Sequence, residues 1–106
     1  MKPADFLTDT HALLSDRARL AIMATLAATK EPLDFNTLVD SLSLTKGNLS
    51  AHALKLEEAG LLRVKKEFVG RKPRTTYACT ERGRSEVRNY LSKVEQLLRH
   101  TKRGSE

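Results

Sequence analysis

Hydrophobic positions recur at helical spacing in two stretches near the start of the chain. Residues 3–14 are the first stretch, a short predicted helix whose opening proline suits the first turn. Ser15 and Asp16 can cap a second helix by accepting hydrogen bonds from free backbone amides, and its apolar stripe continues to about Ala28. Pro32 then breaks the pattern, because proline lacks the amide that a continuing helix needs. We expect the second helix to be the most buried of the chain.

Two short capped helices are predicted next, over residues 34–60. Asp34 caps the first, and its buried face follows the helical spacing of Phe35, Leu38, Val39 and Leu42. Thr45 caps the second, which runs to about Ala59 and ends at Gly60, a residue that readily adopts the left-handed conformation. This second helix is expected to bury Leu49, Ala53 and Leu56. Two capped helices with so short a connection are typical of a helix-turn-helix.

The helical period then gives way to the alternation of a strand. The apolar side of this strand carries Leu62, Val64 and Phe68. The charged side carries Arg63, Lys65 and Glu67, with Lys66 as an exception on the apolar side. Residues 70–74 combine a glycine and a proline in a turn, and residues 75–79 have the β-branched and aromatic content of a returning strand. Residues 61–79 are therefore expected to form a basic two-stranded β-hairpin.

A long amphipathic helix is predicted to close the fold. Thr80 caps it, and residues 80–102 carry one apolar stripe, made by Val87, Tyr90, Leu91, Val94, Leu97 and Leu98. Residues 103–106 follow as a polar tail. The whole predicts one domain over residues 1–102, of the α+β class and mainly α. Its order of N-terminal helix (1–14), helix-turn-helix, hairpin wing and C-terminal helix is that of a winged helix-turn-helix.

The positive charge is concentrated in the predicted hairpin. The chain has a formal net charge of +6, yet its first 62 residues hold six basic and eight acidic side chains. Residues 63–79 hold six basic side chains and one acidic side chain, and residues 80–106 hold seven and four. A short segment with a net charge of +5 favours contact with a polyanion such as the phosphate backbone of nucleic acid.

Several other classes of protein are disfavoured by the sequence. No apolar run approaches the roughly 18 residues of a membrane span, and the N-terminus has no apolar signal segment, so we expect a cytoplasmic protein without a membrane partner. One cysteine, Cys79, and three widely spaced histidines do not make a metal site, and we expect no metal and no cofactor. Phosphate-binding loops and catalytic motifs are missing, which argues against an enzyme.

Two short motifs resemble those of a known family. Residues 49–62 (LSAHALKLEEAGLL) are similar to the recognition-helix signature of MarR- and ArsR-type bacterial and archaeal regulators. Residues 71–77 (RKPRTTY), followed by 80–84 (TERGR), resemble the wing and the start of the last helix in their compact winged-helix relatives. The resemblance implies a dimeric repressor or activator that places one helix per subunit in the major groove. It does not extend to metal sensing, because the paired cysteines or histidines of the metal sensors are missing.

The candidate DNA-binding residues lie on the second helix of the helix-turn-helix and on the hairpin. Steps of about 100° per residue put small and polar side chains opposite the buried face of that helix. The candidates there are Thr45, Lys46, Gly47, Asn48, Ser50, Ala51 and Lys55. On the hairpin, Arg71, Lys72 and Arg74 are expected at the tip, supported by Arg63 and Lys65. His52 lies nearer the buried side and is interpreted as structural.

The last helix is longer than a small winged-helix core needs, so part of its stripe should pack on another chain. The expected two-fold interface contains Phe6, Leu7, Tyr90, Leu91, Val94, Leu97 and Leu98. Such a homodimer would bind an approximate palindrome in double-stranded DNA. An assembly module with an acidic protein partner and a nonspecific architectural DNA binder remain alternatives. The sequence does not identify an effector ligand.

Overall fold

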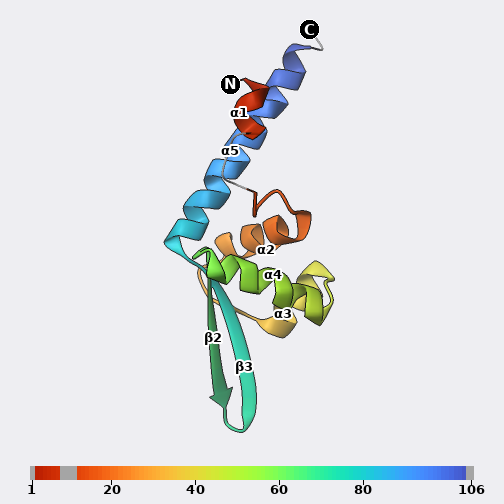
Figure 1. Ribbon diagram of the computed structural model, residues 1–106. Coiled ribbons are helices and arrows are strands. Elements are labelled where there is room, and N and C mark those ends of the chain that lie inside the picture. The colour runs from red at the N-terminus through yellow and green to blue at the C-terminus, as the bar shows by residue number, and fades with distance from the viewer. Residues whose placement is uncertain (1, 8–11, 105–106) are drawn as a thin grey trace.

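The computed structural model describes residues 2–7 and 12–104 of the 106-residue chain. Its elements, in chain order, are α1 (Pro3–Leu7), α2 (Arg17–Ala27), β1 (Leu33–Asp34), α3 (Phe35–Leu42), α4 (Lys46–Glu58), β2 (Leu62–Val69), β3 (Lys72–Cys79) and α5 (Glu81–Arg103). Helices α2, α3 and α4 form the body, the β2–β3 hairpin projects from one end, and α5 projects from the other (Figure 1). The molecule is therefore elongated, with extents of 61 × 24 × 24 Å. The predicted winged helix-turn-helix fold is confirmed.

Each of the four predicted helix caps is formed. A side-chain oxygen of the capping residue accepts a hydrogen bond from the backbone N–H three residues later in α2 (Asp16), α3 (Asp34), α4 (Thr45) and α5 (Thr80). The bond from the Thr37 amide lowers the pKa of Asp34, and the bond from the Arg19 amide lowers that of Asp16. Because these carboxylates bind protons less readily in the folded protein, both helix starts lose stability as the pH falls through the lowered pKa values.

The N-terminal helix is shorter than predicted. Helix α1 ends at Leu7, and residues 12–15 form turns, while residues 8–11 lie outside the described part of the chain. The Arg19 guanidinium donates to the Leu13 carbonyl at 2.8 Å, and the Ser15 hydroxyl donates to the Ala12 carbonyl at 2.8 Å. These bonds stabilise the turn from which the Leu14 side chain enters the core.

The sheet has one strand more than the predicted hairpin. Strand β1 pairs antiparallel with β3, Leu33 opposite Tyr77 and Asp34 opposite Thr76, which gives the order β1-β3-β2. A strand of two residues is too short to show an alternating pattern, which is why the sequence did not predict it. This pairing fixes the base of the hairpin to the start of α3. It thereby holds the wing in a fixed position relative to the helix-turn-helix.

One core connects α2, α3, α4, the sheet and the start of α5, whereas α1 has no buried residue. The side chains that are almost completely buried are Leu14, Ile22, Met23, Leu26, Leu38, Leu49 and Leu56. Tyr77 from β3 and Val87 from α5 close this core. The Arg84 guanidinium donates to the Ala27 carbonyl at the end of α2, which fixes the first turns of α5 against the body.

Beyond these first turns, α5 leaves the body. Its 23 residues span roughly 34 Å, and its buried residues are Gly83 and Val87, both in its first third. The radius of gyration is 16.0 Å, compared with about 13 Å for a compact domain of this size. Most of α5 is therefore available for contacts outside the core.

Gly83 and Gly47 allow a matched test of this packing, because both lie in the first turn of a helix. A methyl group added at Gly83 would lie 2.1 Å from the Leu61 carbonyl oxygen, whereas nothing lies within 4 Å of one added at Gly47. We predict that Gly83→Ala lowers the free energy of unfolding by about 2–4 kcal/mol. Gly47→Ala should raise it by at most about 1 kcal/mol. Urea unfolding measures both, and equal midpoints for the two variants would contradict the close approach of α5.

Candidate nucleic-acid interface

Helix α4 separates a buried face from a polar one. Leu49, Ala53 and Leu56 are buried in the core, as predicted. The seven candidate residues on this helix and its cap are all exposed, namely Thr45, Lys46, Gly47, Asn48, Ser50, Ala51 and Lys55. Gly47 and Ala51 leave the backbone uncovered between longer polar side chains, so a ligand can approach the helix closely along this face.

The two ends of α4 differ in charge. Its N-terminal turn carries the positive end of the helix dipole and Lys46, while its last turn carries Lys55 together with Glu57 and Glu58. The Thr45 hydroxyl accepts from the Asn48 amide at 3.1 Å, and the remaining free amides of the turn point out of the helix end. A polyanion is therefore attracted most strongly to the N-terminal half of α4, and near the C-terminal end Lys55 offsets one of the two acidic charges.

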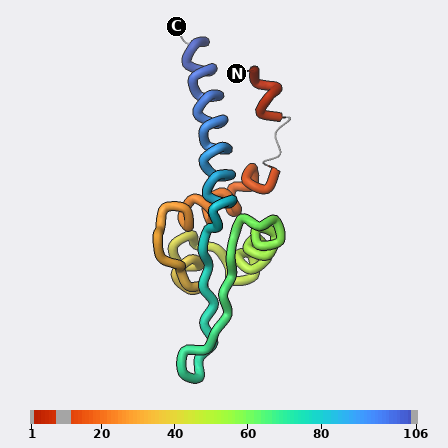
Figure 2. Tube along the Cα trace, turned by 90° about the vertical axis from the view of Figure 1, so that its left-hand side faces the viewer, coloured from red at the N-terminus to blue at the C-terminus, as the bar shows by residue number. Residues whose placement is uncertain are grey.

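The hairpin carries a second group of cations away from the body. The side chains of Arg71, Lys72 and Arg74 are exposed near the turn that joins β2 to β3. Figure 2 shows this turn at the end of the molecule opposite the C-terminus. The three predicted tip residues thus lie where a projecting wing reaches farthest from the core.

The two faces of the hairpin have different surroundings. Val64, Lys66, Thr75 and Tyr77 face α4, since all four line a cleft together with residues of that helix. Alternation along a strand puts Arg63 and Lys65 on the opposite face, where the Lys65 ammonium lies 3.4 Å from the Glu67 carboxylate. Of the predicted wing residues, Arg63 and Lys65 therefore point away from α4.

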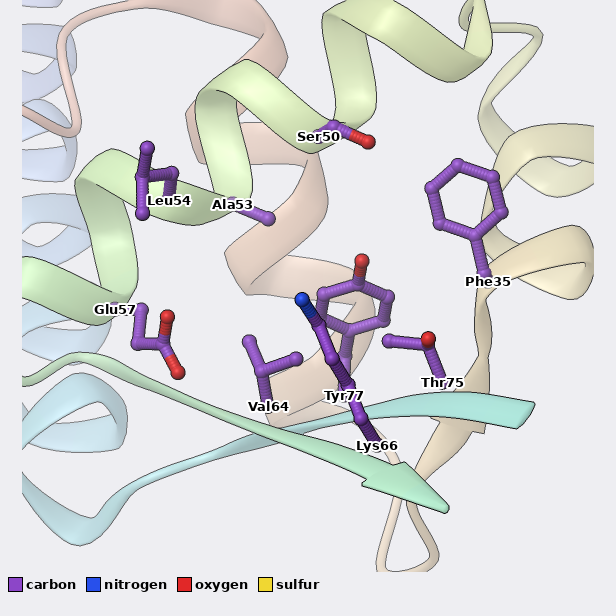
Figure 3. A pocket seen from close by; sticks show the side chains of 9 residues that line it. All are labelled: Phe35, Ser50, Ala53, Leu54, Glu57, Val64, Lys66, Thr75 and Tyr77. Carbon is purple, nitrogen blue, oxygen red and sulfur yellow. The ribbon is translucent and has the colours of Figure 1, made fainter. Parts of the chain in front are cut away.

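The cleft between α4 and the hairpin has a volume of about 430 Å³ and is open to solvent. It is lined by Phe35, Ser50, Ala53, Leu54, Glu57, Val64, Lys66, Thr75 and Tyr77 (Figure 3). Burial, followed by the charge of Glu57, raises the pKa of Tyr77, so its hydroxyl keeps its proton and can donate. Lys66 projects from β2 toward α4 and joins the two cationic elements (Figure 3).

Lys66 was missing from the predicted contact residues. In the sequence it stands out as a charged residue at an apolar position of the alternating pattern. The structure explains this position, because the hairpin has already left the core at Lys66 and the side chain is exposed beside α4. The signal that could have identified Lys66 was thus a cationic residue at a position where the alternation of the strand predicts an apolar one.

His52 and Cys79 have structural surroundings. His52 is half-buried, and its Nδ1 lies 3.5 Å from the Arg19 guanidinium, which connects α4 to α2 as expected for a structural histidine. Burial raises the pKa of the Cys79 thiol, which disfavours the reactive thiolate. Among the described residues, no group of three or more histidine, cysteine or acidic side chains is placed to hold a metal ion.

The predicted dimerisation residues lie on α5 and α1. The rings of Phe6 and Tyr90 are 5.8 Å apart between centroids, so α1 packs beside α5 within the same chain. Leu7, Leu91, Val94 and Leu98 are exposed, and Leu97 is half-buried. None of the helices in the described residues has both the length and the apolar character that crossing a membrane requires.

Comparison with known proteins identifies the fold. Residues 18–98 match the model of the winged helix DNA-binding domain. The chain belongs to this family. An uncharacterised protein of Methanocaldococcus jannaschii is 37% identical over 82 residues, which cover 77% of this chain and 88% of that protein. The transcriptional regulator homologue from Pyrococcus horikoshii OT3 is 29% identical, with a TM-score of 0.82 over 95% of this chain and 98% of that one.

More distant structures share the fold alone. The MepR–DNA complex of S. aureus is 16% identical, with a TM-score of 0.69 over 88% of this chain and 78% of that one. Solved structures of PadR-like and MarR-family regulators also superpose on this chain. The resemblance to MarR-type winged-helix regulators, which the motifs predicted, is confirmed at the level of the fold.

Lys66 and Lys65 provide a test of which face of the wing meets DNA. We predict that Lys66→Ala weakens binding to a duplex about threefold to tenfold and reduces the slope of log affinity against log salt by about 1, since one phosphate contact is lost. Lys65→Ala should change both quantities less, because Lys65 faces away from α4 and lies beside Glu67. Fluorescence anisotropy at several salt concentrations measures both. A larger loss for Lys65→Ala would contradict this orientation.

Proposed function

We propose that this protein is a transcriptional regulator that binds specific sequences of double-stranded DNA as a homodimer. The observation that carries the proposal is the juxtaposition of two elements. The N-terminal half of α4 exposes small and polar residues, and the hairpin beside it holds six cations and one acidic residue. A helix of this kind fits the major groove, and a cationic hairpin beside it can hold the flanking phosphates.

In this proposal α4 contacts base edges. Asn48 has the amide that pairs with adenine in the major groove, and Lys46 and Lys55 bind guanine or phosphate. Gly47 and Ala51 permit a close approach of the helix backbone. Thr45 and Ser50 add hydroxyl contacts to phosphate oxygens.

The wing supplies contacts to the backbone. Arg71, Lys72 and Arg74 bind phosphates or enter the minor groove at the edge of the half-site. Arg63 and Lys65 add to the positive field of the hairpin, which attracts the duplex before contact. These contacts are not specific for sequence, so they set the affinity and the salt dependence, while α4 sets the preference.

The dimer would form through the part of α5 that leaves the body. Leu91, Val94 and Leu98 recur at intervals of three and four residues and make one exposed apolar stripe. A second copy of the same helix would cover this stripe together with Leu97 and with Leu7 of α1. Phe6 and Tyr90 would hold α1 in place beside it. Two copies related in this way present two recognition helices to an approximate palindrome.

The relatives support this proposal through their own descriptions. The Pyrococcus horikoshii protein is described as a transcriptional regulator homologue, and MepR was solved bound to DNA. The winged helix family to which the chain belongs is a DNA-binding family. An alternative is an assembly module whose basic hairpin meets an acidic protein, and the experiments below distinguish it.

Selection from a random duplex library tests sequence preference. At near-physiological salt the protein should enrich an approximate palindrome with two similar half-sites about one helical turn apart. The Arg71→Ala/Lys72→Ala/Arg74→Ala triple variant should bind the enriched site at least tenfold more weakly, with a salt slope reduced by about 3. The ranking of sequences should stay the same, since the recognition helix is unchanged.

Three other results have distinct meanings. Binding with a steep salt slope and no enriched sequence would indicate a nonspecific architectural protein. Absence of duplex binding would favour the assembly module. If the triple variant bound the enriched site as tightly as the wild type, the proposed role of the wing would be contradicted.

Charged substitutions on α5 test the dimer. Leu91 and Leu98 are 43% and 52% exposed, so Leu91→Glu/Leu98→Glu should leave the core intact while placing four like charges in the two-fold interface. We predict a monomer in sedimentation equilibrium, with weaker binding to the palindrome and unchanged binding to a single half-site. Asn89→Glu/Gln96→Glu is the matched control, because it adds the same charge at the same seven-residue spacing on the opposite face of α5. If sedimentation equilibrium showed that the wild type and the control variant are both monomers, the proposed interface would be excluded.

A further inference from the structure

The tip of the wing exposes an aromatic ring as well as cations. Phe68 is 74% exposed, although the alternating pattern puts it on the apolar side of β2 with Leu62 and Val64. It lies opposite Pro73 in the register of the hairpin, so ring and proline are cross-strand neighbours on one face. Both lie beyond the part of the sheet that the body covers. The exposed ring and the proline beside it form a small apolar surface at the end of the projecting hairpin, which a ligand can cover.

The ring faces the same side as the recognition helix. Residues two apart on a strand share a face, so Phe68 lies on the face of Val64 and Lys66, which line the cleft beneath α4. Val69, which is 55% exposed, lies on the opposite face. A ligand that contacts Lys66 on this face of the hairpin can therefore also contact Phe68, whereas Val69 points to the other face.

The surroundings of the ring indicate the chemistry of this ligand. Arg71, Lys72 and Arg74 follow within six residues of Phe68, and each is exposed. An apolar protein surface would have to bury or neutralise these cations, whereas a duplex presents phosphates to them and stacked bases to the ring. Lys66 shares the face of Phe68, whereas Lys72 and Arg74, opposite Val69 and Glu67 in the register, lie on the other face of the same tip. Cations on both faces of the tip therefore favour nucleic acid over an apolar protein partner.

We propose that Phe68, supported by Pro73, inserts between two base pairs from the minor groove next to the major groove that α4 occupies. This inference rests on the proposed function, since it needs α4 on DNA. The minor groove is about 6 Å wide, too narrow for a two-stranded hairpin, so side chains of the tip enter while the strands stay outside. Phe68 cannot hydrogen bond to phosphates or base edges, and its favourable position in the groove is against the faces of partly unstacked bases.

Two consequences distinguish insertion from simple phosphate contact. Insertion opens the step and bends the duplex away from the wing, toward the major groove. It also selects sequence without base-edge hydrogen bonds, because pyrimidine–purine steps such as TA and CA unstack most easily. The wing would then recognise a flexible step on the flank of each half-site, in addition to the bases that α4 contacts.

The test uses the full-length protein and a duplex that the wild type binds. 2-Aminopurine placed in turn at each step of the flank reports unstacking by increased fluorescence, and energy transfer between dyes at the duplex ends reports bending. Phe68→Ala should abolish the fluorescence increase and the bend, and weaken binding about tenfold. Phe68→Trp should retain both signals. Val69→Ala is the matched control, an exposed apolar residue on the other face, and should behave as the wild type.

The step preference gives an independent readout. Replacing the TA or CA step at the position of strongest fluorescence by AA should weaken the wild type several-fold and leave Phe68→Ala unaffected. The proposal is overturned if Phe68→Ala bends and unstacks the duplex as the wild type does. It is also overturned if Val69→Ala loses as much unstacking, bending and affinity as Phe68→Ala. Failure of the proposed function has a different signature, because the wild type would then show no preference among duplex sequences.

Discussion

The close approach of α5 to the turn between α4 and β2 determines how the rest of the molecule is arranged. The Thr80 amide donates to the Leu61 carbonyl at 3.1 Å, and the Thr80 hydroxyl donates to the Gly60 carbonyl at 2.7 Å while accepting from the Gly83 amide. Gly83 has no side chain to separate α5 from Leu61. The end of the recognition helix, both strands of the wing and the start of α5 are therefore joined at one junction.

The surfaces on the two sides of this junction differ in chemical character. On one side lie α4 and the hairpin, whose cations and exposed small residues suit a polyanion. On the other side lies the free part of α5, with an apolar stripe of Leu91, Val94 and Leu98. Because the two surfaces are at opposite ends of an elongated body, a partner on α5 does not compete with a duplex on the wing. The shape thus permits both contacts at once, as the proposed dimeric regulator requires.

The sequence predicted those features that depend on local chemistry. Caps at Asp34 and Thr45 follow from a side chain and an amide three residues apart, and the faces of α4 follow from the helical period. Strand β1 was missed, because two residues give no periodic signal and the strand exists only through its partner β3. The surroundings of Lys66 and Phe68 were missed for another reason. Alternation assigns a residue to a face of a strand, but it does not say where the body that covers this face ends.

The hairpin has a base that the body covers and an outer part that it does not, so one face of it can both close the core and contact a ligand. Near its base, the face toward α4 is apolar and closes the core with Leu62 and Tyr77. Farther out, the same face continues with Lys66 and Phe68, which the core no longer covers. Since the pleat keeps all these residues on one side, the packing that fixes the base also fixes the direction of the outer residues. The core therefore orients the wing toward the side of α4.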